Sequence, residues 1–193
     1  MMAHDAELTR AKLLAAAHEE FITHGIAGSR VARIADTAGV NKERIYAYFG
    51  NKEKLFQAVL TGAMDEMVAL AKPGVDDGDL PGFVGRVMDL HRANPCFLRL
   101  LMWEALHYGA EPQGVLRRRQ EWYTRQVEQL AGATGRPAEE AARQLFVLIG
   151  IGAWPTALLS PPLFGAEHDD MLLWQQRLRA SVVDFVARAL KEV

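Results

Sequence analysis

The block from Gly39 to Leu55 most constrains what this chain can fold into. It reads GVNKERIYAYFGNKEKL and holds glycine and asparagine at both of its turns. A short helix is predicted over residues 32–38, and Gly39 follows it where a left-handed residue commonly ends a helix. Asn41 is a good N-cap for a second helix that runs to about Tyr48. Two helices joined by so short a turn form a helix-turn-helix.

The second helix of this block has two chemically different faces. Ile45 and Phe49 are four residues apart and are predicted to point to the core. The opposite face is charged and phenolic, with Lys42, Glu43, Arg44, Ala47 and Tyr48. Asn51 caps a third helix and leaves Lys52 and Lys54 in its first turn, where the helix dipole does not favour cations. A phosphate partner accounts for these lysines, although a solvated helix of an ordinary helical domain shares the pattern.

The whole N-terminal third extends this pattern. RAKLLAAAHEEFITHGIAGSRVARIADTAGVNKERIYAYFGNKEKLF contains an apolar first helix ending near Phe21 and Gly25, an IA…AGV core over residues 34–40, and YAYFGNKEKLF over residues 46–56. From Thr9 to about Leu60 the sequence resembles the tetracycline-repressor (TetR) family of bacterial transcription regulators. The resemblance implies an all-α fold of about nine helices. Residues 1–54 would form the helix-turn-helix DNA-binding domain, and residues 55–193 the effector-binding and dimerisation domain.

The resemblance also implies which residues of the recognition helix meet DNA. Lys42, Glu43 and Arg44 would reach base edges, where lysine or arginine donates to guanine O6 and N7. Tyr46 would touch a thymine methyl group or the backbone, with partial packing in the core as the alternative. Tyr48 and Lys52 would contact phosphates and set the register.

Two positions before Asn41 depart from the family pattern. The family usually has Ser or Thr as the cap of the second helix where this chain has Arg30, and often a basic residue where it has Ala32. Ser29 is then the expected cap, and Arg30 or Arg33 the expected phosphate contact. The predicted DNA-binding residues are Arg30, Arg33, Asn41, Lys42, Glu43, Arg44, Tyr46, Tyr48 and Lys52.

Charge is unevenly distributed along the chain. The formal net charge is −2, so the chain as a whole is not a polybasic nucleic-acid binder. Residues 29–54 alone carry six cations and three anions, a local charge of +3, and leave −5 for the rest. This asymmetry suits a small DNA-binding module attached to an acidic domain.

Cysteine usage and hydropathy predict a cytoplasmic protein. Cys96 is the single cysteine, which excludes an intramolecular disulfide and favours a buried packing thiol over a redox switch. Asp5 and Glu7 precede any apolar run, so no signal peptide is expected. The longest apolar stretch, residues 145–159, is too short to span a bilayer.

Beyond residue 54 the sequence continues as one amphipathic helix after another, without a convincing strand pattern. The helix predicted over residues 97–106 is apolar nearly all round, which indicates burial. Glu104 within it therefore needs a partner, and Arg119 and His107 are the candidates. Glu104 either forms an internal salt bridge or anchors a mainly apolar, ring-bearing effector. The resemblance places an effector pocket here, with Met64, Met67, Met88, His91, Trp103, Glu104, His107, Tyr108, Arg119, Trp122, Tyr123 and Trp154 as candidates.

The last two helices are apolar over more of their surface than helices at the edge of a monomer need. The resemblance implies that these helices of two copies form a four-helix bundle, so the partner is a second copy of this chain. The predicted interface residues are Leu145, Leu148, Ile149, Trp174, Leu178, Val182 and Phe185. Such a homodimer would bind double-stranded DNA at a pseudo-palindromic operator.

The sequence lacks the common motifs of enzymes. It contains no G-x-S-x-G, no H-E-x-x-H, no phosphate-binding glycine loop and no Cys/His metal spacing. We therefore expect no catalysis, no cofactor and no metal. The main hypothesis is a repressor released from its operator by a small molecule. The alternative is a dimeric DNA-binding regulator without a small-molecule effector, controlled by a protein partner.

Overall fold

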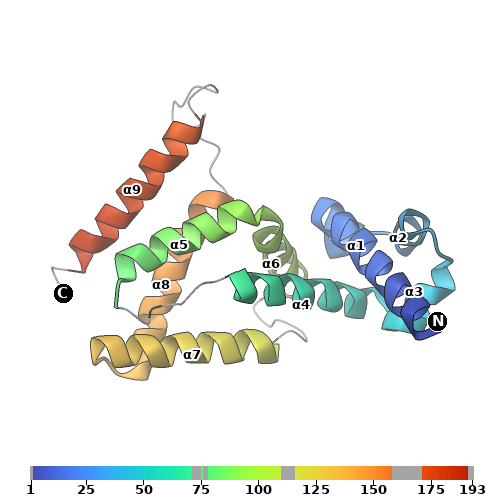
Figure 1. Ribbon diagram of the computed structural model, residues 1–193, viewed down its shortest axis with the longest axis horizontal. Coiled ribbons are helices and arrows are strands. Elements are labelled where there is room, and N and C mark those ends of the chain that lie inside the picture. The colour runs from blue at the N-terminus through green and yellow to red at the C-terminus, as the bar shows by residue number, and fades with distance from the viewer. Residues whose placement is uncertain (1, 71–74, 76–77, 110–115, 158–170, 191–193) are drawn as a thin grey trace. The chain divides into compact units, whose positions relative to one another are not determined.

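Every regular element in the described part of the chain is an α-helix (Figure 1). The computed structural model describes residues 2–70, 75, 78–109, 116–157 and 171–190. The nine helices in these ranges are α1 (Met2–Gly28), α2 (Val31–Ala38), α3 (Lys42–Phe49), α4 (Lys52–Leu70), α5 (Leu80–Ala93), α6 (Pro95–Tyr108), α7 (Leu116–Thr134), α8 (Ala138–Ala157) and α9 (Met171–Ala189). The predicted all-α fold is confirmed. Among the described helices, none is long and apolar enough to cross a membrane.

The chain divides into two compact units. The first unit comprises Met1–Glu66 and Arg99–Arg119, and the second comprises Met67–Leu98 and Gln120–Val193. The first unit therefore holds α1 to α3 and most of α4 and α6, whereas the second holds α5, α8, α9 and most of α7. Because compactness groups most of α6 with the N-terminal helices, the predicted division at residue 54 stays a proposal about function.

The core of the first unit is built by the N-terminal helices. Leu13 and Phe21 of α1 are fully buried, as are Ile34 of α2 and Ile45 of α3. The Phe21 ring meets Phe56 of α4 edge to face, with centroids 5.1 Å apart. These contacts hold α2 and α3 against α1 and α4, and the exposed face of α3 is thereby also fixed.

Helix α1 breaks at Gly25, close to its predicted end. This residue has φ 65° and ψ −177°, which a residue with a Cβ atom rarely adopts. A Cβ added there would lie 2.6 Å from the Trp103 ring of α6. The Trp103 indole Nε1 donates a hydrogen bond of 3.2 Å to the carbonyl of Ile22. Glycine is therefore required both by the backbone and by the close approach of α6 to α1.

The core of the second unit forms where α5 packs on α8 and α9. Its buried residues are Val75, Leu80, Phe83, Val84, Val87, Leu130, Ala141, Leu145, Leu148 and Val186. Gly152 lets α8 approach α5 closely, because a Cβ there would lie 2.7 Å from Val87 Cγ1 and 3.1 Å from the carbonyl oxygen of Val84. Helix crossings this tight require a small residue at the contact.

Candidate nucleic-acid interface

The turn between α2 and α3 has the predicted geometry. Gly39 ends α2 in the left-handed conformation, with φ 67° and ψ 34°. The next amide, of Val40, donates to the Ala35 carbonyl at 3.0 Å. Asn41 then caps α3, since its side-chain oxygen accepts a 3.2 Å hydrogen bond from the Arg44 amide. The predicted cap and turn are confirmed, and together they set the direction in which α3 leaves the turn.

Helix α3 buries one face and exposes the other. Ile45 and Phe49 are buried as predicted, and the Arg10 guanidinium lies 5.6 Å from the centroid of the Phe49 ring. Lys42, Glu43 and Arg44 are exposed on the opposite side.

Tyr46 belongs to the exposed face, with 45% of its surface accessible. The Lys42 ammonium lies 5.9 Å from the centroid of its ring, a cation–π distance. The alternative of packing Tyr46 in the core is therefore disfavoured. The helix presents a cation and a phenol ring side by side, which suits contacts to phosphate and base edges.

The start of α2 differs from the prediction. The Ser29 hydroxyl is buried and donates to the Ile26 carbonyl at 2.8 Å, so it is turned back toward α1 and does not cap α2. Arg30 occupies the N-cap position without a side-chain cap of its own. Its amide instead donates to Oε1 of Glu20 at 2.7 Å. The prediction that Ser29 caps α2 is wrong, because a carboxylate from α1 takes that role.

Glu20 also binds Arg33. The guanidinium donates through Nε at 2.9 Å and through Nη2 at 2.6 Å, and Nη2 also reaches the Gly28 carbonyl at 3.1 Å. Burial raises the pKa of Glu20, but the bonds from Arg33 and the Arg30 amide outweigh it and hold the pKa below its ordinary value. Of the two predicted phosphate contacts, Arg33 is thus engaged within the protein, whereas Arg30 is exposed.

Lys52 connects the start of α4 to the turn before α2. Its ammonium lies 3.4 Å from the Ser29 carbonyl and the side chain is half-buried. Asn51 caps α4 by accepting from the Lys54 amide at 2.8 Å, as predicted. Tyr48 is half-buried, with its ring centroid 6.2 Å from that of Phe49. Tyr48 and Lys52 are therefore both half-buried, whereas Lys54 is exposed.

Glu20 is the functional residue that the sequence interpretation missed. It lies on the face of α1 that carries Ala16, Ala17 and Phe21, all of which are buried. A charged residue on the apolar face of a helix needs a partner, and that signal was present in the sequence. The partner was not identifiable from spacing, because Arg33 belongs to a different helix.

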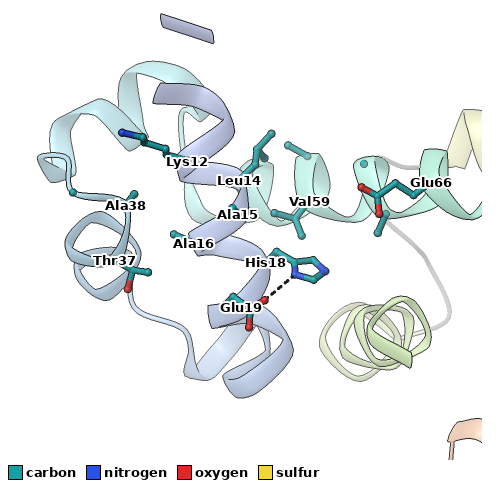
Figure 2. A pocket seen from close by; sticks show the side chains of 14 residues that line it. Lys12, Leu14, Ala15, Ala16, His18, Glu19, Thr37, Ala38, Val59 and Glu66 are labelled. Atoms are coloured by element: carbon teal, nitrogen blue, oxygen red, sulfur yellow. Dashed lines mark ion pairs between the residues drawn. The ribbon is translucent and has the colours of Figure 1, made fainter. Parts of the chain in front are cut away.

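A groove of about 850 Å³ lies on another side of the same unit (Figure 2). Figure 2 shows Thr37 and Ala38 on one side of α1, and Val59 and Glu66 on the other. Small side chains line most of it, and its charged residues are one lysine, Lys12, and the two glutamates Glu19 and Glu66. Since its balance of full charges is negative, this groove is unsuited to DNA phosphates. The basic face of α3 remains the candidate interface.

The predicted effector residues divide between the two units. The first unit holds Met64, Trp103, Glu104, His107, Tyr108 and Arg119, and the second holds Met67, Met88, His91, Trp122, Tyr123 and Trp154. The three methionines and His91 are buried, whereas His107 and Tyr123 are exposed, and so is Trp154, with 60% of its surface accessible. Trp122 is half-buried and meets Tyr123 edge to face.

Glu104 has the internal partner that its burial demanded. Arg119 Nη1 donates to Glu104 Oε2 at 2.5 Å, and the Glu104 side chain is 4% exposed. Burial, followed by the charges of Glu53 and Glu104, raises the pKa of Tyr108. The Tyr108 hydroxyl is buried and has no hydrogen-bond partner among the described residues. The internal salt bridge, one of the two alternatives for Glu104, is confirmed.

The predicted interface residues on α8 and α9 are placed unequally. Leu145 and Leu148 belong to the chain's own core, while Ile149, Trp174, Leu178 and Val182 are half-buried. Phe185 is exposed, and so are five neighbours that were not predicted, namely Phe146, Val147, Trp154, Leu172 and Leu173. Leu145 and Leu148 are therefore replaced as interface candidates by these exposed residues. The exchange is possible because α8 is apolar on its inner and outer faces alike.

Comparison with known proteins agrees with this geometry. The family model "Bacterial regulatory proteins, tetR family" matches residues 13–59, and "Tetracyclin repressor-like, C-terminal domain" matches residues 79–188. The chain is 42% identical over 158 residues to the HTH-type transcriptional repressor SCO4008 of Streptomyces coelicolor, covering 80% of this chain and 81% of that protein. It is 37% identical over 112 residues to the HTH-type transcriptional repressor NicS of Pseudomonas putida, covering 55% of this chain and 53% of that protein.

A solved structure supports the same assignment for the entire fold. The crystal structure of SCO4942 from Streptomyces coelicolor superposes with a TM-score of 0.74 at 30% identity, over 94% of this chain and 97% of that one. The two family models together span both the helix-turn-helix and the helices that follow it. The chain therefore belongs to the TetR family of DNA-binding transcription regulators.

Proposed function

We propose that this protein is a homodimeric repressor that binds a pseudo-palindromic site in double-stranded DNA and leaves it when a small molecule binds. The exposed face of α3 carries the proposal. Lys42 and Arg44 are exposed there, whereas the opposite face of the helix is buried in the core. Repression is the function that SCO4008 and NicS have by name.

Dimerisation follows from the apolar surface of the second unit. Exposed large apolar residues lie along α8 and α9, most prominently Phe146 at 81%, Leu172 at 66% and Phe185 at 62% exposure. Large apolar residues exposed on two helices that both pack on α5 favour an interaction site there. A two-fold axis through α8 and α9 pairs identical patches and gives the dimer two copies of α3. These would meet successive major grooves about 34 Å apart.

Helix α6 supports an effector response. Its residues from Arg99 onward belong to the same compact unit as α1, and its first residues belong to the second unit. Trp103 fastens α6 to α1 through the bond to Ile22 and the contact with Gly25. A ligand that moves α6 would therefore act on the helices that carry α3. DNA affinity would fall by the difference in the ligand's affinity for the two states.

A regulator without a small-molecule effector is the second candidate. The Glu104–Arg119 pair favours it, because the polar anchor expected for an effector is already satisfied within the chain. A protein partner would then control DNA binding.

Selection of bound sequences from random DNA tests the primary proposal. We expect a two-fold symmetric consensus with half-sites about one helical turn apart. Fluorescence anisotropy on the selected site, with and without a panel of small molecules, then tests release. A consensus without symmetry would contradict the dimeric mode of binding. Tight binding that no compound relieves would favour control by a protein partner.

A further inference from the structure

A groove of about 230 Å³ lies within the second unit and is separate from the Glu104–Arg119 pair. The end of α5, the start of α6, the end of α8 and one face of α9 form it. An engineered apolar cavity of about 150 Å³ accommodates benzene. This groove therefore has room for one aromatic ring with small substituents.

The groove carries an excess of positive charge. Arg179 Nε donates to Asp89 Oδ2 at 2.8 Å, and Arg92 Nη2 approaches Asp89 Oδ1 at 3.2 Å. Asp89 is the one acidic residue among the described residues that line the groove, so two guanidinium groups share a single carboxylate. A guanidinium has five N–H donors, and each arginine gives Asp89 only one in these bonds. Asp89 therefore leaves further donors unused, most clearly on the exposed Arg92, whereas Nη2 of Arg179 packs beside Gly85.

His91 adds a polar group that lacks a partner. It lines the groove, is 6% exposed, and its Nδ1 has no hydrogen-bond partner among the described residues. The Phe97 ring stacks on it with centroids 6.2 Å apart and an interplanar angle of 15°, which fixes the imidazole. Buried polar groups of native proteins are nearly always hydrogen-bonded. A polar ligand atom within hydrogen-bond distance of His91 Nδ1 would give this nitrogen a partner.

Apolar side chains complete the wall. Met88 is buried, and Trp174 and Leu178 present half-buried faces from α9. An indole ring offers a flat surface for an aromatic ligand, and a methionine adapts to its edge. The groove thus combines an anion-binding end, an aromatic wall and one unsatisfied imidazole.

We propose that this groove is the effector site and that it takes a small aromatic carboxylate bearing a second polar group on its ring. The carboxylate binds Arg92 and Arg179, the ring lies against Trp174, and the second polar group meets His91. This inference rests on the proposed effector response, and it replaces the Glu104 anchor with the two arginines. It also specifies an acidic ligand where the sequence predicted a mainly apolar one.

Calorimetric titration of the full-length protein tests the proposal with 4-hydroxybenzoate as the probe and its methyl ester as the uncharged counterpart. We expect saturable binding of the acid and at least about tenfold weaker binding of the ester, the loss typical of a charge-assisted hydrogen bond. Arg92→Gln, at an exposed position, should weaken binding of the acid similarly. His91→Phe, which keeps a ring against Phe97, should do the same. Arg143→Gln, at an exposed arginine outside the groove, is the matched control and should bind like the wild type.

Equal affinity for acid and ester, or wild-type affinity in Arg92→Gln, would overturn the proposal. No saturable binding of the acid at millimolar concentration would overturn it too. DNA affinity measured on the same samples separates this inference from the proposed function. A protein that binds its selected DNA but not the probe leaves the repressor proposal standing. If the protein binds the probe through Arg92 and its DNA affinity is unchanged, the binding site is supported. The same result contradicts release from DNA by this class of ligand.

Discussion

Glu20 is the residue on which the geometry of the DNA-binding helices most depends. Its carboxylate accepts from the Arg30 amide at the start of α2 and from the Arg33 side chain one turn later. It therefore replaces the serine or threonine cap usual in the family, and it holds α2 against α1. A single carboxylate thus explains the departure at Arg30, and it also engages Arg33.

Glu20→Gln should destabilise the protein by about 1 to 3 kcal/mol, the contribution of hydrogen bonds to a charged group. The pKa of Glu20 is lower in the folded protein than its ordinary value of 4.5, so its stabilisation is complete above that pH. It is lost as the pH falls through the folded pKa. Urea unfolding at several pH values should show the largest difference between wild type and variant near neutrality. Glu19→Gln, at an exposed neighbour, is the control, and an equal effect of both variants would contradict the role of Glu20.

Arg44→Ala should relax base preference at one position of each half-site. Arg44 is exposed on α3, and a bidentate arginine–guanine contact is worth about 1 to 3 kcal/mol of discrimination. The measurement is competition between the selected site and single-base variants of it. Unchanged base preference in Arg44→Ala would show that another residue of α3 reads the bases.

Lys52→Ala should instead weaken binding to all DNA sequences alike. It should also reduce the slope of log affinity against log salt concentration by about 2 per dimer.

Features set by neighbouring residues were predictable. Of the contacts between helices, Glu104–Arg119 was among the candidates and Glu20–Arg33 was not. Gly39, Asn41 and Ile45 follow from turn geometry, capping and periodicity, each of which needs only a few neighbouring residues. The role of Glu20 depends on two partners of α2, the Arg30 amide and the Arg33 side chain, which lie ten and thirteen residues further along the chain. Sequence spacing does not report which way a side chain turns at such a distance. Ser29 was misplaced for a local reason, because its hydroxyl bonds back to the Ile26 carbonyl of α1.

Among the helices, α6 connects the groove residues to the DNA-binding helices along the chain. It begins at Pro95, which lines the groove, and Trp103 lies two turns further on, against Gly25 of α1. The contact is tight because Gly25 has no Cβ and adopts a positive φ. A substitution at Gly25 or Trp103 should therefore change how tightly α6 is packed on α1.

Gly25→Ala should destabilise the protein by about 1 to 3 kcal/mol from backbone strain, with a further loss from the clash with Trp103. Gly28→Ala is the matched control, since its nearest neighbour would be His24 Cβ at 3.5 Å. In a Trp103→Ala background the clash is absent, so Gly25→Ala should cost less there. Chemical unfolding of the wild type, Gly25→Ala, Trp103→Ala and the double variant gives the double-mutant cycle. Strict additivity would show that the Trp103 ring does not press on Gly25.

Helix α8 shows why the interface was predicted only in part. Its apolar residues occupy nearly the whole circumference, so periodicity cannot select the inner face. Packing against α5 through Gly152 decides it, and that contact buries Leu145 and Leu148. Phe146 and Val147, one position away, are consequently exposed. The sequence predicted an apolar outer surface, and the helix crossing determines which residues form it.

For the whole molecule, the proposed DNA-binding and dimerisation surfaces lie at different ends of the sequence. The segment 29–54 is basic and the remainder is acidic, which favours approach of DNA to α3 and disfavours it elsewhere. A single copy of α3 reads only one half-site. Under the proposed mode of dimerisation, affinity for a symmetric operator would therefore depend on the apolar residues of α8 and α9, which would bring the second copy.

Phe185→Glu and Phe146→Glu should each convert the dimer into a monomer and weaken operator binding. Both side chains are largely exposed in the single chain, at 62% and 81%, so a glutamate there disturbs little of the monomer's packing. In a dimer the same glutamate would be buried without a partner, which is costly. Leu106→Glu, at a residue of α6 that is 74% exposed, is the matched control and should remain dimeric. Light scattering at micromolar concentration measures the mass, and anisotropy measures binding to the operator and to a single half-site. Half-site binding should persist in both monomeric variants, because α3 is unchanged. A monomeric wild type, or dimers in both phenylalanine variants, would contradict an interface formed by α8 and α9.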